Sequence, residues 1–503
     1  NQFRSEDVSG WDRFKLICKP EQSAKTFLMI NEIISEFEKD ENNDVVNFIF
    51  CDNNLLLTKQ TTERISLEER IPVAEDGLNH VEFSSRKTKT TSNNIDSVIG
   101  KIMCGARNIV CCTNGRRIAD ISELVIRLDK IHMSRFMFKI WLDEADKFTK
   151  AISETFRPLA DKFKNVFVNC ITATPNRLFS KFKNMKVLPI EKTTSPQYHG
   201  WNDNNIKIME NNSETTEGFV DEVIETLKEN GNKPLSGTKW FVPAESKKMN
   251  HNIIKDTLVK QGFAVIVVNG NGLSLTIPND SQEFIEKKSK VLNTQLREML
   301  AKHNCSNFPI AVTGNICIGR GISIMSPEFM FDYGIMSYCG NDSEVSQTAG
   351  RLKGNMKLWN GYKPPTVYTT EEFNEIATEF EIKSRSLASL AFSKNAEVPS
   401  VITNHEFRSL TEKDSKWNVD CKEFSSRKEA NDFLKENGFR KNHKEKKDSE
   451  GFLLSPTISK TKKLVYSEFK KDMNDWEPLA NISINKKKPL KRYGKMFICY
   501  KNP

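Results

Sequence analysis

The stretch Phe138-Lys139-Ile140-Trp141-Leu142-Asp143-Glu144-Ala145-Asp146 is a short apolar run that ends abruptly in carboxylates. Residues 138–142 have the composition of a buried strand in a parallel sheet. Ligands of such sheets bind beyond the carboxyl ends of the strands, where Asp143 would hold a hard cation and Glu144 would orient or deprotonate a water. A strand followed by an acidic first helical turn explains the same residues. The stretch therefore predicts a parallel α/β sheet and leaves both interpretations of its carboxylates open.

An upstream segment has the order strand, loop, Lys-Thr, helix. Residues 14–18 are apolar, residues 19–26 read Lys-Pro-Glu-Gln-Ser-Ala-Lys-Thr, and residues 27–34 have helical spacing. This is the layout of a phosphate-binding loop, in which Lys25 would reach the phosphates and Thr26 would ligate Mg²⁺. The pattern GxxxxGK[ST] expects glycine where Lys19 and Ala24 stand, because glycine lets the backbone approach the phosphates. An ordinary helix start is the alternative.

Strand–loop–helix units recur along the first 190 residues, which predicts a doubly wound parallel sheet. Their strands are expected at residues 14–18, 47–51, 108–112, 138–142 and 166–171. The polar residues 66–97 are expected to form a loop or insertion. A second polar segment, 191–215, predicts a domain boundary.

A second α/β series begins at Thr238. Its strands are expected at 238–243, 264–268, 309–312, 331–337 and 366–369, and its helices at about 246–260, 282–303 and 371–392. Beyond residue 394 the pattern weakens. Ser426 and Glu429 form a capping box that opens a helix ending at Asn437-Gly438.

Composition fits a soluble globular protein, with 38% hydrophobic and 28% charged residues and no apolar run long enough to span a bilayer. The 11 cysteines are scattered without a CxxC pair, which favours reduced thiols in an intracellular setting. The net charge of +9 is unevenly placed: residues 438–503 hold 17 Lys and Arg against 7 Asp and Glu. This tail, with its interleaved aromatic residues, predicts a polyanion partner. A solvated lysine-rich surface, or the core of a small domain, explains the same residues.

Hydroxyl residues lie near the ends of several expected strands. Thr58 and Thr113 follow two of them, where polar groups can contact a nucleic-acid backbone or begin a helix. Thr172 and Thr174 follow another, where their hydroxyls would bond the carboxylates of the Asp-Glu-Ala-Asp stretch. Such a bond would link nucleotide state to the next domain.

Taken in order, these stretches resemble the motifs of a superfamily 2 (DEAD/DEAH-like) helicase, with a general similarity to the divergent helicases of large DNA viruses and phages. The resemblance covers roughly residues 10–375. The matching stretches are Gln22-Ser23-Ala24-Lys25-Thr26 (motif I), Asp143 to Asp146 (motif II), Thr172-Ala173-Thr174 (motif III), Thr313-Gly314 to Arg320-Gly321 (motif V) and Gln347 to Arg351 (motif VI).

The resemblance implies two RecA-like doubly wound parallel-sheet domains in tandem, with ATP and Mg²⁺ in the cleft between them. The domains are expected at residues 1–195 and 196–375, followed by a small basic α+β accessory region at 376–503. It also implies a helicase or translocase that couples ATP hydrolysis to movement along nucleic acid, with DNA preferred over RNA as the expected partner and no membrane. The alternative is a nucleic-acid-binding scaffold whose degraded phosphate loop supports little or no turnover.

The resemblance assigns roles position by position. Motif VI usually has a second arginine three residues after the first, but Gly354 stands there. Either Arg351 or Arg320 could therefore serve as the arginine finger. The implied roles are nucleotide binding for Gln22, Ser23, Ala24, Lys25, Thr26, Arg320 and Gly321, metal binding for Thr26 and Asp143, general base for Glu144, γ-phosphate contact for Gln347 and Arg351, nucleic-acid contact for Thr58, Thr113, Thr313 and Gly314, and domain coupling for Thr172 and Thr174.

Overall fold

The computed structural model describes residues 13–39, 44–51, 55–84, 91–132, 135–210, 213, 215–244, 248–269, 272–280, 282–287, 292–314, 324–337, 341–411, 419–424, 464–470 and 495–501. The chain divides into two compact units, Asn1–Thr411 and Glu412–Pro503, which are described separately. In the described part of the chain, no helix is both long enough and apolar enough to cross a membrane.

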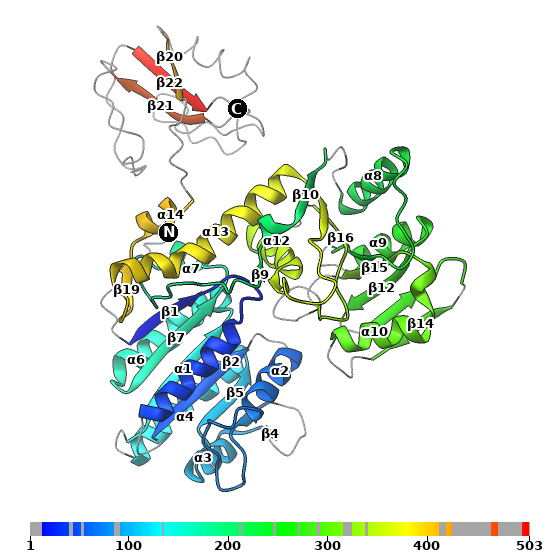
Figure 1. Cartoon of the computed structure of the whole chain (residues 1–503). Helices are drawn as coiled ribbons and strands as arrows, with labels where there is room; N and C mark the ends of the chain where they lie inside the picture. The colour runs from blue at the N-terminus through cyan, green and yellow to red at the C-terminus, as the bar shows by residue number, and fades with distance from the viewer. Residues whose placement is uncertain are drawn as a thin grey trace. The chain divides into compact units, whose positions relative to one another are not determined.

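The first sheet of the larger unit has the strand order β19-β8-β1-β7-β6-β2-β5-β3-β4 and is parallel except at β19 (Figure 1). All five predicted strands are present within it. The strands are β1 (Phe14–Cys18), β2 (Val45–Cys51), β3 (Val81–Phe83), β4 (Thr91–Ser92), β5 (Asn108–Cys112), β6 (Met137–Asp143), β7 (Val166–Thr172), β8 (Met185–Val187) and β19 (Ser400–Ile402).

Helices cover both faces of this sheet because successive strand residues point to opposite sides. Ile17 packs in one apolar cluster with Ile33, whereas its neighbour Leu16 packs in another with Leu124. The helices are α1 (Lys25–Lys39), α2 (Leu55–Ser66), α3 (Ile95–Met103), α4 (Gly115–His132), α5 (Thr149–Ala151), α6 (Arg157–Lys162) and α7 (Asn176–Lys181), with the short 3-10 and π turns η1 (Ala145–Phe148) and η2 (Ile152–Phe156). Residues 66–97 are not simply a loop, since β3 and β4 extend the sheet there.

The second sheet has the order β10-β18-β16-β11-β15-β12-β13-β14. Its strands are β10 (Asn205–Ile208), β11 (Lys239–Phe241), β12 (Ala264–Asn269), β13 (Gly272–Thr276), β14 (Glu283–Glu286), β15 (Ile310–Gly314), β16 (Tyr333–Met336) and β18 (Thr366–Thr369), and its helical segments are α8 (Thr216–Glu229), α9 (Lys248–Lys260), α10 (Leu292–Lys302), η4 (Cys305–Asn307), α12 (Asp342–Ala349) and η5 (Gly350–Leu352). Trp240 packs in a cluster with Phe219 of α8, and its neighbour Phe241 packs with Leu296 of α10. The predicted tandem of RecA-like doubly wound sheets is therefore confirmed.

The helix predicted over residues 282–303 is wrong in its first half. Residues 283–286 form β14, an edge strand that pairs antiparallel with β13, and α10 begins only at Leu292. The sequence Glu-Phe-Ile-Glu is short and charged at both ends, so its helical and strand patterns are hard to separate, and the adjacent β13 decides between them.

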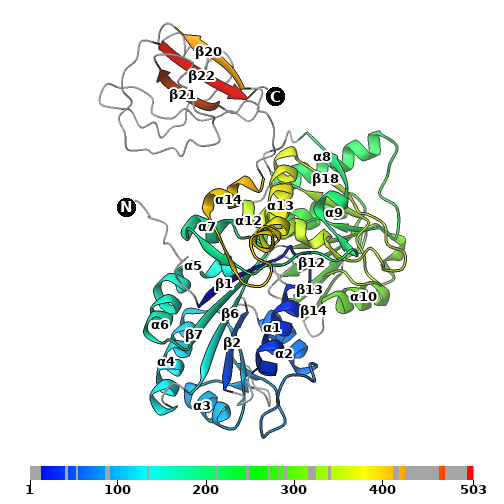
Figure 2. The same ribbon diagram turned by 60° about the vertical axis from the view of Figure 1, so that its left-hand side comes forward.

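The chain returns to the first sheet after completing the second (Figures 1 and 2). Helix α13 (Glu371–Lys394) leads back, the Ile190 amide donates to Ala388 O of this helix at 3.2 Å, and β19 pairs with β8. Helix α14 (Asn404–Ser409) then stacks Phe407 on Phe179, with ring centroids 4.1 Å apart. The boundary expected at residue 376 falls inside α13, and residues up to Thr411 belong with the larger unit.

Short elements lie in the segment that leads from the first sheet to the second. Strand β9 (Tyr198–His199) pairs antiparallel with β17 (Gly354–Asn355), and η3 (Trp201–Asp203) follows β9. The smaller unit contains an antiparallel sheet of the order β20-β22-β21, formed by β20 (Val419–Phe424), β21 (Leu464–Lys470) and β22 (Lys495–Lys501). The helix predicted from the Ser426 capping box lies outside the described residues.

Candidate nucleotide-binding site

The loop between β1 and α1 turns back on itself through two residues with left-handed backbone. Gln22 has φ 56° and Ala24 has φ 64°, and the Ser23 hydroxyl donates to Pro20 O at 2.7 Å inside the turn. The Leu28 amide then donates to Ala24 O at 3.1 Å, which starts the helix. A left-handed turn at Ala24 is the conformation that a glycine adopts at no steric cost. The missing glycine of the phosphate-loop pattern has therefore been replaced without a change in the backbone that it serves.

The two carboxylates lie where β6 ends. Asp143 is the last residue of the strand, and Glu144 turns the chain with φ 56° and ψ 48°. The Glu144 amide donates to Asp143 Oδ1 at 3.1 Å. Burial, and then the charge of Glu144, raise the pKa of Asp143 to about 6. A cation placed beside such an acid favours the charged form of the carboxylate and offsets the effect of burial.

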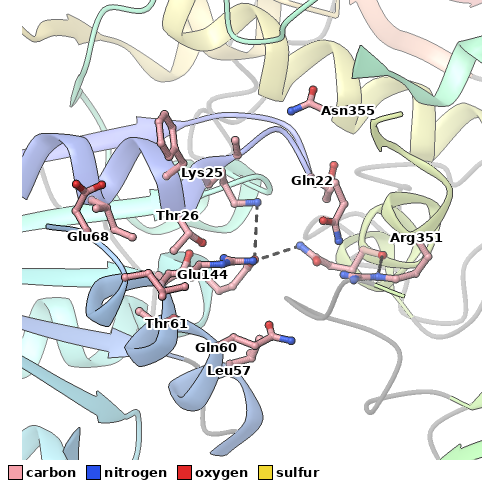
Figure 3. A pocket seen from close by; sticks show the side chains of 18 residues that line it. Gln22, Lys25, Thr26, Leu57, Gln60, Thr61, Glu68, Glu144, Arg351 and Asn355 are labelled. Carbon is pink, nitrogen blue, oxygen red and sulfur yellow. Dashed lines mark hydrogen bonds and ion pairs between the residues drawn. The ribbon is translucent and has the colours of Figure 1, made fainter. Parts of the chain in front are cut away.

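The second sheet contributes two side chains from the segment of α12 and η5. The Gln347 amide donates to Glu144 Oε2 at 3.5 Å, and on the other side Lys25 Nζ lies 3.9 Å from Glu144 Oε1 (Figure 3). Arg351 is 4% exposed, and its Nε donates to Gln347 O at 3.3 Å. Glu144 is thus held between a cation of the first sheet and an amide of the second.

These residues line one cavity of about 520 Å³. Of the predicted site residues, the cavity collects Gln22, Ala24, Lys25, Thr26, Asp143, Glu144, Gln347 and Arg351. Ser23 is buried in the turn and does not line it. Arg320 and Gly321 lie outside the described residues. The prediction missed the remaining wall, which consists of Glu21, Phe27, Ile30, Leu57, Gln60, Thr61, Arg64, Leu67, Glu68 and Asn355.

A helical pattern was available for part of the missed wall. Leu57, Gln60, Thr61 and Arg64 have the spacing of one face of α2, which follows β2. Because α2 follows β2, this face of the helix lines the cavity beside the loop that follows β1.

The donor set fits a magnesium ion. Thr26 offers a hydroxyl and Asp143 a carboxylate, both on the cavity wall. Mg²⁺ in phosphate sites takes one or two protein oxygens and completes its shell with waters and phosphates, rather than using a cage made by the protein alone. Among the described residues, no group of three or more His, Cys, Asp or Glu could hold a metal. Thr26 and Asp143 would hold the ion, which would neutralise phosphate charge.

Thr172 and Thr174 connect the end of β7 to the turn after β6. The Thr172 hydroxyl donates to Asp146 Oδ1 at 3.1 Å, and the Thr174 amide donates to the Thr172 hydroxyl at 3.0 Å. Both threonines are buried. The expected bond to an Asp-Glu-Ala-Asp carboxylate is present for Thr172, whereas the Thr174 hydroxyl lies 3.4 Å from the Thr172 hydroxyl. The coupling role of the two residues stays a prediction.

The residues predicted to contact nucleic acid lie in differing surroundings, and the buried Thr313 hydroxyl has no hydrogen-bond partner within the described residues. Thr58 is fully buried with its hydroxyl 3.0 Å from Cys112 Sγ, and Thr313 is fully buried in β15. For Thr58 and Thr313 the nucleic-acid role stays a prediction. The Thr113 hydroxyl donates to Cys51 O, and Gly314 O accepts from the Ala244 amide at 2.9 Å. For Thr113 and Gly314, the nucleic-acid role stays a prediction.

No model of a known protein family matches this sequence, and no curated protein matches it. Among solved structures, it is similar to Mss116p bound to ssRNA and AMP-PNP, with a TM-score of 0.42 and 11% identity over 75% of this chain and 69% of that chain. It is also similar to the Type ISP restriction-modification enzyme LlaBIII bound to DNA (TM-score 0.41, 13% identity, 74% of this chain and 28% of that one). A third is the Mycobacterium smegmatis helicase Lhr bound to ssDNA and AMP-PNP (TM-score 0.36, 9% identity, 78% and 47%).

The strand order and the shared cavity describe this chain independently of those distant likenesses. Two RecA-like α/β sheets follow one another in it. The loop after β1 and the carboxylates at the end of β6, both from the first sheet, and the segment from Gln347 to Arg351 of the second line one cavity.

Proposed function

We propose that this protein is an ATP-dependent helicase or translocase that hydrolyses ATP in the cavity between its two RecA-like sheets and moves along DNA. The observation that carries the proposal is the composition of the cavity wall. Lys25, Thr26, Asp143 and Glu144 come from the first sheet, and Gln347 and Arg351 come from the second.

The wall residues have complementary tasks. Lys25 and the start of α1 would bind the phosphates, because a helix N-terminus and an ammonium both favour anions. Glu144 would take the proton of the attacking water. Arg351 would stabilise negative charge that develops on the γ-phosphate, as arginines in such sites do.

Movement would follow from the origin of Gln347 and Arg351. A nucleotide that contacts both sheets favours the arrangement in which they are close, by the free energy of those differential contacts. Loss of the γ-phosphate on hydrolysis would remove part of this preference. Repeated cycles of this kind, with each sheet gripping the DNA backbone, would step the protein along a strand.

A nucleic-acid-binding scaffold with little turnover is the competing function. The observation in its favour is the loop itself, because non-glycine residues occupy both of its left-handed positions. The intact arrangement of Lys25, Asp143 and Glu144 favours an active enzyme.

The deciding experiment measures steady-state ATPase activity with no nucleic acid, single-stranded DNA, duplex DNA and RNA. We expect stimulation by DNA. Glu144→Gln should bind ATP but lose about 10²–10⁴ in turnover, the contribution of a general base. Equal turnover by Glu144→Gln and the parent protein would contradict the assignment. Parent turnover no higher than that of a Lys25→Ala control would favour the scaffold. Stimulation by RNA alone would reassign the nucleic acid.

A further inference from the structure

The phosphate loop contains a buried acidic residue, Glu21, directly before the left-handed Gln22. Its side chain is 3% exposed, although it neighbours a site built for anionic phosphates. The Ser346 hydroxyl donates to Glu21 Oε1 at 2.5 Å, and Lys353 Nζ donates to Glu21 Oε2 at 3.2 Å. We call residues 346–354, which include both partners and the stretch from Gln347 to Arg351, the motif VI segment. The first sheet's phosphate loop is therefore held by side chains that lie more than 300 residues further along the chain.

The Lys353 side chain is buried and both of its ion pairs are with carboxylates of the larger unit. Its side chain is 0% exposed, and its ammonium also lies 3.3 Å from Glu381 Oε2 of α13. Burial alone would lower the pKa of Lys353, but Glu21 and Glu381 together raise it above its usual value. The ammonium thus remains charged between two carboxylates. It does not line the cavity of the site, so it is not a phosphate ligand in this arrangement.

The backbones of the two segments are also complementary. A Cβ on Gly350 would lie 2.8 Å from Glu21 Cβ, and a Cβ on Gly354 would lie 3.3 Å from Gln22 Cβ. On the other side of the loop, the Tyr198 hydroxyl donates to Glu21 O at 2.9 Å. Glycine at these two positions lets the motif VI segment approach the loop closely enough for Ser346 and Lys353 to reach Glu21.

The loop needs such support. Gln22 and Ala24 adopt φ values of 56° and 64°, which cost a residue with a side chain about 1–2 kcal/mol each relative to right-handed backbone. A glycine-rich loop pays no such penalty. Here the contacts of the Glu21 carboxylate hold the residue next to the first left-handed turn, and they depend on the position of the motif VI segment.

We propose that Lys353 is a positioning residue for nucleotide binding, which acts through Glu21 to hold the glycine-poor phosphate loop in its left-handed turns. The position next to Gly354, where the family's second arginine is missing, would thus serve the loop rather than the γ-phosphate. The inference rests on the proposed function in one respect, that the loop binds a nucleotide.

The test measures the affinity of the full chain for ATP by fluorescence or calorimetric titration. Lys353→Met should weaken binding about tenfold or more, the equivalent of one lost hydrogen bond to a charged group. The matched control is Lys357→Met, which removes a lysine just beyond the motif VI segment that pairs with Asp203 at 2.8 Å on the surface. This control should bind like the parent protein.

A second substitution separates positioning from direct contact. Ala24→Gly should increase the affinity of the Lys353→Met variant more than that of the parent protein, because the parent's loop is already held. In the Lys353→Met background it should restore about fivefold, since glycine removes roughly 1 kcal/mol of left-handed cost. A lysine that touched the nucleotide would not be rescued by a change in the loop.

The outcomes distinguish a failure of the proposed role of Lys353 from a failure of the nucleotide site itself. If Lys25→Ala lost binding while Lys353→Met bound like the parent protein, Lys353 would not be a positioning residue, although the site would stand. If Lys25→Ala itself bound normally, the phosphate loop would fail as the nucleotide site. Should Lys353→Met not fold, Ser346→Ala decides in its place, because it removes the 2.5 Å bond to Glu21 without leaving a buried charge unpaired.

Discussion

At the scale of single residues, Ala24 shows how a sequence pattern can be broken without its structure being lost. The pattern asks for glycine because the backbone must be left-handed, and the backbone at Ala24 is left-handed with φ 64°. The side chain is only a methyl group and is exposed. The departure therefore has a cost in backbone strain.

That strain makes a prediction for stability. Ala24→Gly should stabilise the protein by about 0.5–1 kcal/mol, the difference between the relieved left-handed cost and the extra chain entropy of glycine. Ala24→Val should destabilise it, because a β-branched side chain tolerates positive φ poorly. Denaturant unfolding of the larger unit measures both changes. If Ala24→Gly were the less stable of the two, the loop would not have the backbone described.

At the scale of elements, the contact between the phosphate loop and η5 gives the protein a dependence on acid. Burial would raise the pKa of Glu21, but Lys353, Lys25 and the Ser346 hydroxyl outweigh it and hold the pKa below the ordinary 4.5. The unfolded chain therefore takes up a proton at this position at a higher pH than the folded protein does. The stability that Glu21 contributes is complete above about pH 4.5 and is lost as the pH falls through the folded pKa.

We expect this loss to be visible against Glu21→Gln. The parent protein should be more stable than the variant at pH 7, and its advantage should shrink below about pH 4.5, where protonation cancels the charge. Unfolding free energies between pH 7 and 3.5 measure the difference. Glu63→Gln is the matched control, since its pair with Lys59 is half exposed and contributes little. A constant advantage across the range would show that the charge of Glu21 is not involved.

The elements also show which parts of the fold a sequence can predict. The strands β1, β2, β5, β6 and β7 are apolar runs buried on both faces, so their composition alone identifies them. Strands β13 and β14 were missed because an antiparallel extension depends on its neighbour as much as on its own residues.

The site divides in the same way. Lys25, Asp143 and Glu144 were predicted because each belongs to a local sequence pattern: Lys25 begins the helix after β1, and the two carboxylates lie at the end of β6. The contact of Glu21 with Lys353 was not, because it joins residues 332 positions apart and depends on how the second sheet packs against the loop. An acidic residue inside a phosphate loop was the available signal, since it requires a cation to neutralise it.

At the scale of the whole molecule, charge is concentrated in the smaller unit. Residues 412–503 hold 23 Lys and Arg against 14 Asp and Glu, a net of +9 that equals the net charge of the entire chain. The larger unit, which contains the cavity of the candidate site, is neutral overall. If the proposed function holds, phosphate attraction and nucleotide chemistry would belong to different parts of the chain.

We expect a protein ending at Thr411 to bind single-stranded DNA more weakly than the full chain, with a shallower salt dependence. Each phosphate that the removed lysines neutralise should account for about 0.7 of the slope of log affinity against log salt. ATPase activity without nucleic acid should persist, because the last residue that lines the cavity is Asn355 and the truncated protein retains it. Parallel salt titrations of the two proteins on one oligonucleotide measure the slopes. Lines that coincide would mean that the smaller unit does not touch DNA.

The return of the chain through α13 to β19 makes the second sheet an insertion within the first domain. A fragment ending near residue 195 would lack β19, which pairs with the edge of β8, and Phe407, which covers Phe179. Such a fragment would expose apolar surface and an unpaired strand edge. The first domain is therefore built from two separate segments of the chain. To isolate it, residues 205–369 must be replaced with a short linker, because a single cut would remove the second segment.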